Sequence, residues 1–258
     1  MEPMNWTYDS ELGLRLWGGL ASVGMNDIRE NLRKESIAMQ AASWNGSLDS
    51  EKLAMAVLGG FEASYGVAPE LKLVGSIDLR GVWVTGVFEG YGVNSTYDPI
   101  LGLVSQEVTR ISRFSAWGGE AGIVYFLRYI GNFSRLGLEV KAGPHSLTGS
   151  QDSYEETGLL RSGLSKLKYS GSAAGFFTGL LWEWMVPEPS SSLPFSGFFS
   201  AGYRFLKFAS VKYSYTDSSG VYSTGTLRDA DGRDMAVDFS GPEITIGFSL
   251  LFPVQPPR

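Results

Sequence analysis

Apolar and polar residues alternate with a period of two along seven or eight stretches of the chain. Successive side chains of a strand point to opposite faces, so this pattern predicts strands with one apolar and one polar face. The stretch 133–143 is the clearest, because Leu136 and Leu138 alternate there with Arg135 and Glu139. The predicted strands are Glu11–Ala21, Leu53–Tyr65, Leu71 to about Tyr91, Phe114–Tyr129, Phe133–Gly143, about Gly175–Trp184, Phe195 to about Tyr213 and Glu243–Phe252.

The connections between these stretches alternate between short and long. Short turns at one end and long loops at the other are the layout of an antiparallel barrel that crosses a membrane. In the first long connection a short helix is expected from Asp27 to about Ser43, with Asp27 as its N-cap. A loss of phase near Arg204 and Lys207 predicts a bulge in the seventh stretch. The predicted long loops are residues 22–52, 92–113, 144–172 and 214–242.

The composition of the two faces indicates which of them points outward. The polar face is mostly Gly, Ala and Ser with one to three charges per strand, which fits a narrow interior. The apolar face carries Leu, Ile and Val, and places Trp182, Trp184, Tyr125 and Tyr129 near strand ends, as in an interfacial girdle. The sequence therefore predicts an all-β fold, a closed antiparallel up-and-down transmembrane β-barrel of about eight strands. A soluble lipocalin-like barrel is the structural alternative.

This barrel is expected to occupy residues 11–252, between an N-terminal extension of residues 1–10 and a C-terminal tail of residues 253–258. The 33 glycines and 13% aromatic residues favour an all-β protein. The net charge of −6 gives no reason to expect nucleic acid as a partner, and the absence of cysteine excludes disulfides and thiol nucleophiles. The first residues lack the basic start and apolar core of a signal peptide, so an exported chain is expected to have lost one.

Charged residues of both signs occur in the middle of the polar faces. Each would be costly alone in a dry interior, but as a network they compensate one another. We therefore expect a lumen charge network that consists of Arg15, Glu62, Asp78, Arg80, Glu120, Arg135, Glu139, Lys141, Glu183 and Arg204.

The last predicted strand contains a recognisable motif. Residues 245–252, Thr-Ile-Gly-Phe-Ser-Leu-Leu-Phe, resemble the C-terminal β-signal of bacterial outer-membrane proteins. With the strand rhythm, the chain resembles the small eight-stranded outer-membrane barrels of the OmpA and OmpW type over residues 11–252. This resemblance implies a place in the bacterial outer membrane and recognition by the barrel-assembly machinery through Thr245, Gly247, Leu250 and Phe252. The short tail after Phe252 departs from the family pattern, and the charged lumen fits the OmpW branch poorly.

Lipid A deacylases and palmitoyltransferases of the outer membrane use a serine and a histidine near the long-loop end of a strand. Here His145 is the single histidine, and Ser146 is adjacent to it, so alternation points the two side chains to opposite faces. We read His145 as a histidine at the edge of a loop and expect no enzymatic activity. The run Asp229–Asp234 resembles a calcium loop but lacks the ligand spacing and the closing glutamate, so neither a metal nor a cofactor is expected.

These features favour a non-enzymatic barrel whose lumen is plugged by salt bridges and whose long extracellular loops serve surface interaction or envelope integrity. The alternatives are a narrow channel or porin for small solutes, and a lipid A-modifying enzyme. The expected partners are outer-membrane lipids, lipopolysaccharide and the assembly machinery, and the oligomeric state is left open. Arg29, Arg33 and Lys34 of the loop helix are candidates to meet lipopolysaccharide phosphates.

Overall fold

The computed structural model describes residues 11–41, 45–48, 54–90, 97–98, 102–103, 106–130, 134–157, 160–186, 195–217, 219–228 and 232–253. Its first half contains β1 (Glu11–Ser22), α1 (Asn26–Ala41), β2 (Asn45–Leu48), β3 (Met55–Ala68), β4 (Leu71–Gly90), β5 (Tyr97–Asp98), β6 (Gly102–Leu103) and β7 (Gln106–Ile130). The second half contains β8 (Ser134–Thr157), β9 (Leu160–Val186), β10 (Phe195–Phe205), β11 (Lys207–Phe208), β12 (Lys212–Asp217), β13 (Tyr222–Thr226), β14 (Val237–Asp238) and β15 (Gly241–Pro253).

Eight of these strands close into a ring in which every neighbouring pair is antiparallel. The order around the ring is β1, β3, β4, β7, β8, β9, β10 and β15, and β15 returns to β1. Glu11 at the start of β1 pairs with Pro253 at the end of β15, so the two ends of the barrel sequence are neighbours. The predicted closed up-and-down barrel of eight strands is confirmed.

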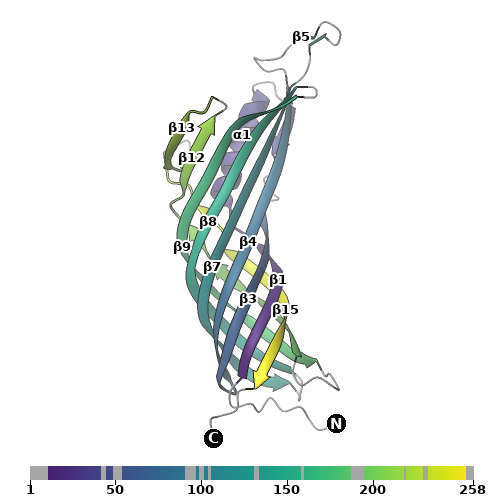
Figure 1. Cartoon of the computed structure of the whole chain (residues 1–258), viewed down its shortest axis with the longest axis vertical. Coiled ribbons are helices and arrows are strands. Elements are labelled where there is room, and N and C mark those ends of the chain that lie inside the picture. Colours follow the sequence, from purple (N-terminus) through teal and green to yellow (C-terminus); the bar gives the residue numbers. More distant parts are fainter. Residues whose placement is uncertain are drawn as a thin grey trace.

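The ring has one tall side (Figure 1). β7, β8 and β9 have 25, 24 and 27 residues, whereas β1, β10 and β15 have 12, 11 and 13. β9 pairs with β10 only up to Phe176, and above this point its residues 165–170 pair with β12, which in turn pairs with β13. The extensions of β7, β8 and β9 together with β12 and β13 form a sheet that we call the upper wall.

The predicted loop over residues 144–172 is therefore wrong. Every described residue in this range belongs to β8 or β9, and residues 106–113 likewise belong to β7. The reason is a change of polarity along the strand. In β8, Leu138 is exposed and Glu139 buried, but higher up Leu147 is buried and Thr148 exposed. The alternation continues while the apolar residues change faces, so the pattern used to recognise the lower strands no longer applies.

The inner side of the upper wall holds a conventional apolar core. Phe114, Leu147 and Tyr169 of the wall are buried in one cluster with Ile28 and Leu32 of α1. The chain between β10 and β15 completes this core with Leu206, Phe208, Val211, Met235, Val237 and Phe239. In this part of the molecule the packing is that of a soluble protein, apolar inside and polar outside.

The helix predicted in the first long connection is confirmed, but the prediction that Asp27 is its N-cap is wrong. α1 begins at Asn26, so Asp27 lies in its first turn and is not the N-cap. Its carboxylate instead accepts a hydrogen bond from the backbone N–H of Ala236 at 3.0 Å, which joins α1 to the segment before β15. None of the helices among the described residues is long and apolar enough to cross a membrane.

The bulge predicted near Arg204 and Lys207 is also wrong. β10 ends at Phe205, and the chain turns inward, where the N–H of Leu206 donates to Ser240 Oγ at 2.9 Å. Lys207 and Phe208 then form β11, which pairs with β14. The loss of phase thus marks the point where the chain leaves the ring to build the apolar core.

Candidate functional site

Along the strands of the lower barrel, side chains point alternately to an apolar outer surface and to a charged interior. On β1, Leu16 is 69% exposed, whereas its neighbours Arg15 and Trp17 are buried. On β4 the exposed Ile77 alternates with the buried Asp78. Apolar side chains thus cover the outside of the ring, and ionic groups fill its centre.

One group of these charges surrounds Glu183 of β9. Its carboxylate lies 2.7 Å from Arg135 Nη2, 3.3 Å from Arg15 Nη2 and 3.6 Å from Lys72 Nζ. Arg135 also donates to Glu11 at 2.8 Å, and Lys72 contacts the same carboxylate. Three cations from three strands therefore share two carboxylates.

A second group lies around Lys141 of β8. Its ammonium is 3.1 Å from Glu62 and 3.0 Å from Glu139. Glu62 also accepts from Arg15 at 2.8 Å, and Glu139 accepts from the hydroxyl of Ser200 at 3.1 Å. Because Arg15 contacts both Glu62 and Glu183, it connects this group to the first.

The third group lies nearest to the apolar core and contains Arg80 and Arg204. Both guanidinium groups bond the carboxylate of Glu243, with Arg80 at 3.0 Å and Arg204 at 3.1 Å. Arg80 also contacts Asp78, and Arg204 also contacts Glu120. The two arginines are thus held between carboxylates on opposite walls of the barrel.

His145 belongs to this third group and is not at the edge of a loop. Its ring is buried, with Nε2 3.0 Å from Asp78 Oδ1 and Nδ1 3.3 Å from the carbonyl oxygen of Gly143. Both ring nitrogens thus face oxygen atoms of the lumen. The reading of His145 as a loop-edge residue is therefore wrong, because the strand continues past it.

The structure brings all ten residues of the expected network together, and each makes at least one ion pair. The sequence reading missed Glu11, Lys72, Glu243 and His145 as members. Glu11, Lys72 and Glu243 lie in the polar phase of their strands, so the alternation itself could have found them. We call these fourteen residues the lumen network.

The charges of the lumen network nearly cancel. Among the described residues it contains seven carboxylates, six guanidinium or ammonium groups and one imidazole. Its net charge is therefore −1 with a neutral His145 and zero when the imidazole is protonated. Aromatic rings fill spaces between the charges, with the Arg135 guanidinium 3.9 Å from the ring centre of Phe126 and that of Arg15 5.0 Å from the ring centre of Phe198.

A small cavity lies among the described side chains of the lumen. A cavity of about 10 Å³ lies between Trp17, Lys141 and Phe177, with Glu62 and Arg204 also in its lining. This is near the smallest volume that holds one water molecule. The buried charged side chains of the lower barrel line this cavity closely.

The donor atoms of Asp78, Glu120 and His145 lie within 4.8 Å of one another, a spacing suited to a metal ion. Asp78 is already bonded to Arg80, and Glu120 to Arg204. The positive charge that a metal would bring to these carboxylates is supplied by the guanidinium groups, so we assign this cluster to the lumen network.

Ser146 does not join His145. Its side chain lies on the outer side of β8, since His145 and Leu147 on either side of it are buried. The calcium-like run falls partly outside the described residues, and its last member, Asp234, pairs with Arg228 at 3.2 Å. No serine–histidine pair is therefore formed at this position.

The residues of the C-terminal motif all lie on β15. Thr245 and Gly247 face the lumen, whereas Leu250 is exposed on the outer surface and Phe252 is half-buried. Phe252 pairs with Leu12 of β1, where the ring closes. The N-terminal extension and residues 254–258 of the tail lie outside the described residues, as does the side chain of Tyr129.

A closed eight-stranded ring with an apolar outer surface and a charged, packed interior defines a transmembrane β-barrel of the bacterial outer membrane. The expected fold and location are thereby confirmed.

Solved structures to which this chain is similar include several outer-membrane proteins. They include the attachment invasion locus protein Ail of Yersinia pestis (11% identity, TM-score 0.36, covering 94% of this chain and 97% of that one). A major outer membrane protein of Thermus thermophilus has 12% identity and a TM-score of 0.44, covering 93% and 99%. OprG of Pseudomonas aeruginosa has 13% identity and a TM-score of 0.35, covering 95% and 97%. No protein-family model and no curated protein matches the chain.

Proposed function

We propose that this protein is a non-conducting outer-membrane barrel that anchors the upper wall at the cell surface. The observation that carries the proposal is the lumen filled with buried charged side chains, among which lies a cavity of about 10 Å³. Long strands that continue out of the membrane as a sheet, with their own apolar core, provide a rigid surface for contact with other molecules.

A pore would require a path for solutes through two successive barriers. The first is the lumen network, whose ion pairs span the barrel from wall to wall, such as Arg80 of β4 to Glu243 of β15. The second is the apolar core above it, which includes Phe208 and Phe239. Both barriers favour the plugged barrel over the channel alternative.

A lipid A-modifying activity lacks support at the position that suggested it. The ring of His145 points into the lumen and bonds Asp78, while Ser146 lies on the opposite face of β8. A nucleophilic serine requires a base within hydrogen-bonding reach, and His145 is not placed to serve Ser146. We therefore favour a non-enzymatic role.

Conductance in planar lipid bilayers tests the proposal. Protein whose folding has been verified by heat-modifiable migration in electrophoresis is expected to give no steady current. The double variant Arg15→Ala, Lys141→Ala removes two cations of the lumen network and is expected to introduce a measurable leak. A steady open current from the wild-type barrel would overturn the proposal.

A further inference from the structure

The outer face of the upper wall carries a regular array of hydroxyl and cationic side chains. The register places them in three rungs that run across β7, β8, β9, β12 and β13. From the membrane outward the rungs are Ser115–Thr148–Ser170–Lys212–Thr226, Arg113–Ser150–Lys168–Ser214–Thr224 and Ile111–Asp152–Lys166–Thr216–Tyr222. We call this surface the cation–hydroxyl face.

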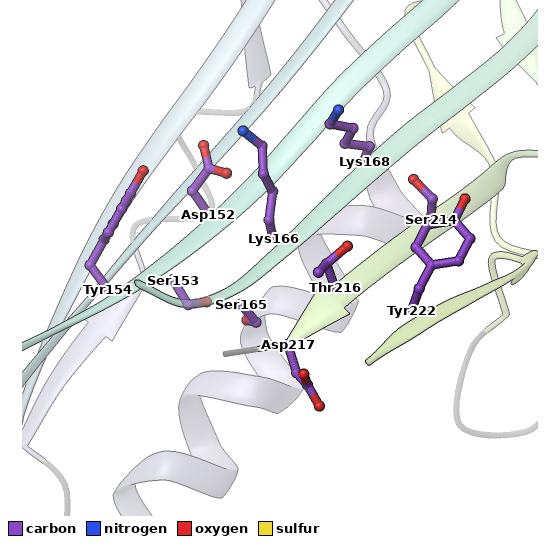
Figure 2. A pocket seen from close by; sticks show the side chains of 10 residues that line it. All are labelled: Asp152, Ser153, Tyr154, Ser165, Lys166, Lys168, Ser214, Thr216, Asp217 and Tyr222. Carbon is purple, nitrogen blue, oxygen red and sulfur yellow. The ribbon is translucent and has the colours of Figure 1, made fainter. Parts of the chain in front are cut away.

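The direction of these side chains follows from their neighbours. On β9, Lys166, Lys168 and Ser170 are exposed, whereas Leu167 and Tyr169 between them pack on the apolar core. Figure 2 shows Lys166 and Lys168 extending from the same side of the strand, with Asp152 on the neighbouring strand beside Lys166. The cation–hydroxyl face therefore lies on the outside of the upper wall and points away from the barrel axis.

The cation–hydroxyl face begins where the lipid-facing surface ends. The rung directly below it contains Trp117, Ser146 and Ser172. Below that rung the outer surface carries apolar side chains such as Ile123 and Leu180. Strand residues advance about 3.3 Å each, so the three rungs lie within about 20 Å of Trp117 along the strands. They therefore lie just beyond the apolar band of the outer surface.

The charge of this face is opposite to that of the chain as a whole. Arg113, Lys166, Lys168 and Lys212 contribute four positive charges against the single carboxylate of Asp152, although the whole chain carries −6. Within the part of the chain that the structure describes, the three lysines have no ion-pair partner. Their charge is thus available to an anionic ligand.

The face is also hollowed. A depression of about 540 Å³ is lined by residues that include Lys166, Lys168, Asp152 and Tyr222 (Figure 2). A second depression, of about 640 Å³, adjoins Lys168, Lys212 and Tyr222. Asp217 also borders the first, but its carboxylate is bonded to Ser219 and to the backbone of Val221. Ammonium groups, hydroxyls and an exposed tyrosine ring together suit a phosphorylated sugar.

We infer that the cation–hydroxyl face binds the phosphorylated saccharide head groups of the lipopolysaccharide that surrounds the barrel. This inference deepens the proposed surface role and rests on the location of the barrel in the outer membrane. The inference places the lipopolysaccharide contact on the upper wall instead of on α1, where Arg33 already bonds Glu30 at 2.8 Å. The ammonium groups pair with phosphates, while serine and threonine hydroxyls bond sugar hydroxyls.

The test compares binding of fluorescent lipopolysaccharide to folded protein in detergent micelles. The variant Lys166→Ser, Lys168→Ser, Lys212→Ser is expected to bind on the order of 100-fold more weakly at low salt. The matched control Arg29→Ser, Lys34→Ser, Lys207→Ser removes the same charge elsewhere and is expected to bind like wild type. Enzymatically dephosphorylated lipopolysaccharide and phosphatidylglycerol are expected to bind wild-type protein much more weakly than the intact glycolipid.

Equal binding by the wall variant and wild type would overturn the inference, as would a loss confined to the control variant. Undiminished binding of the dephosphorylated glycolipid would show that the face does not contact the phosphates. Equally tight binding of phosphatidylglycerol would show that it does not contact the saccharide. Either result contradicts the inference. Bilayer conductance of the same preparations separates the two proposals. A wild-type barrel that conducts but binds lipopolysaccharide through the wall refutes only the closed lumen.

Discussion

Arg15 and Glu62 stand directly opposite one another on β1 and β3, and their side chains meet inside the barrel with Nη1 and Oε1 2.8 Å apart. Glu62 also bonds Lys141 at 3.1 Å, so Glu62→Leu leaves two buried cations short of a partner. Removing one member of a buried ion pair typically costs about 3–5 kcal/mol, and we expect a loss of this size in the free energy of unfolding. Urea unfolding of the barrel in lipid vesicles measures it.

The control for this prediction is Glu30→Gln on α1. Glu30 pairs with Arg33 in contact with solvent, where water and salt screen an ion pair so well that it adds little to stability. We expect this variant to unfold at nearly the wild-type urea concentration. A comparably small effect of Glu62→Leu would mean that the lumen network does not hold the barrel together.

Phe239 tests the independence of the apolar core from the membrane barrel. Its ring packs edge-on against Phe208 with centres 6.3 Å apart, and both rings are fully buried. Phe239→Ala is expected to cost about 3–5 kcal/mol in the core. We expect proteases to cut within residues 206–239 while heat-modifiable migration of the barrel persists. The control Phe248→Ala changes a lipid-facing ring on β15 and should leave this segment resistant; equal cleavage of both variants would argue against a separate core.

The turn between β12 and β13 is expected to weaken in acid. Hydrogen bonds from the Ser219 hydroxyl and from the N–H groups of Val221 and Ser219 hold the pKa of Asp217 below its usual value of about 4. A lowered pKa in the folded state means that the stabilisation is complete above the unfolded pKa and is lost as the pH falls through the folded one.

The amide proton shift of Val221, followed by NMR between pH 6 and pH 2, measures this titration. We expect a midpoint below that of a free aspartate, and Asp217→Asn is expected to abolish the transition. A midpoint at or above the ordinary aspartate value would show that the turn does not stabilise the carboxylate.

Phe252 tests recognition by the barrel-assembly machinery. Phe252→Ala is expected to lower the amount of folded barrel in the outer membrane of cells, because it removes the aromatic end of the assembly signal. Spontaneous refolding of the same variant into detergent is expected to proceed as in wild type. Phe248→Ala, on the same strand but at none of the four recognised positions of the signal, is the control. Equal losses in cells and in detergent would assign Phe252 to stability alone.

The sequence was sufficient to predict the membrane-embedded part of the molecule, because there the alternation of Leu138 with Glu139 or Leu16 with Arg15 has a constant phase. The sequence pattern could not reveal the upper wall, because there the polar residues are exposed and the apolar ones buried. On β9, Lys168 and Ser170 are exposed, whereas Leu167 and Tyr169 pack on the apolar core. Alternation of this kind is typical of a sheet whose outer face is exposed to water. His145 was misplaced for this reason: it lies in the lumen just below the point where the polarity changes.

The outward side chains of β9 change from polar to apolar along the strand, and spin-label accessibility tests this change most directly. Because the chain contains no cysteine, single cysteines can be introduced at the outward positions from Lys166 to Trp182. In lipid vesicles we expect labels at Lys166, Lys168 and Ser170 to collide with a water-soluble nickel complex. Labels at Phe176, Leu180 and Trp182 should collide with oxygen dissolved in the hydrocarbon, with the crossover near Ser172. Free access of the nickel complex to Leu180, or a lipid-like environment at Lys168, would contradict this account.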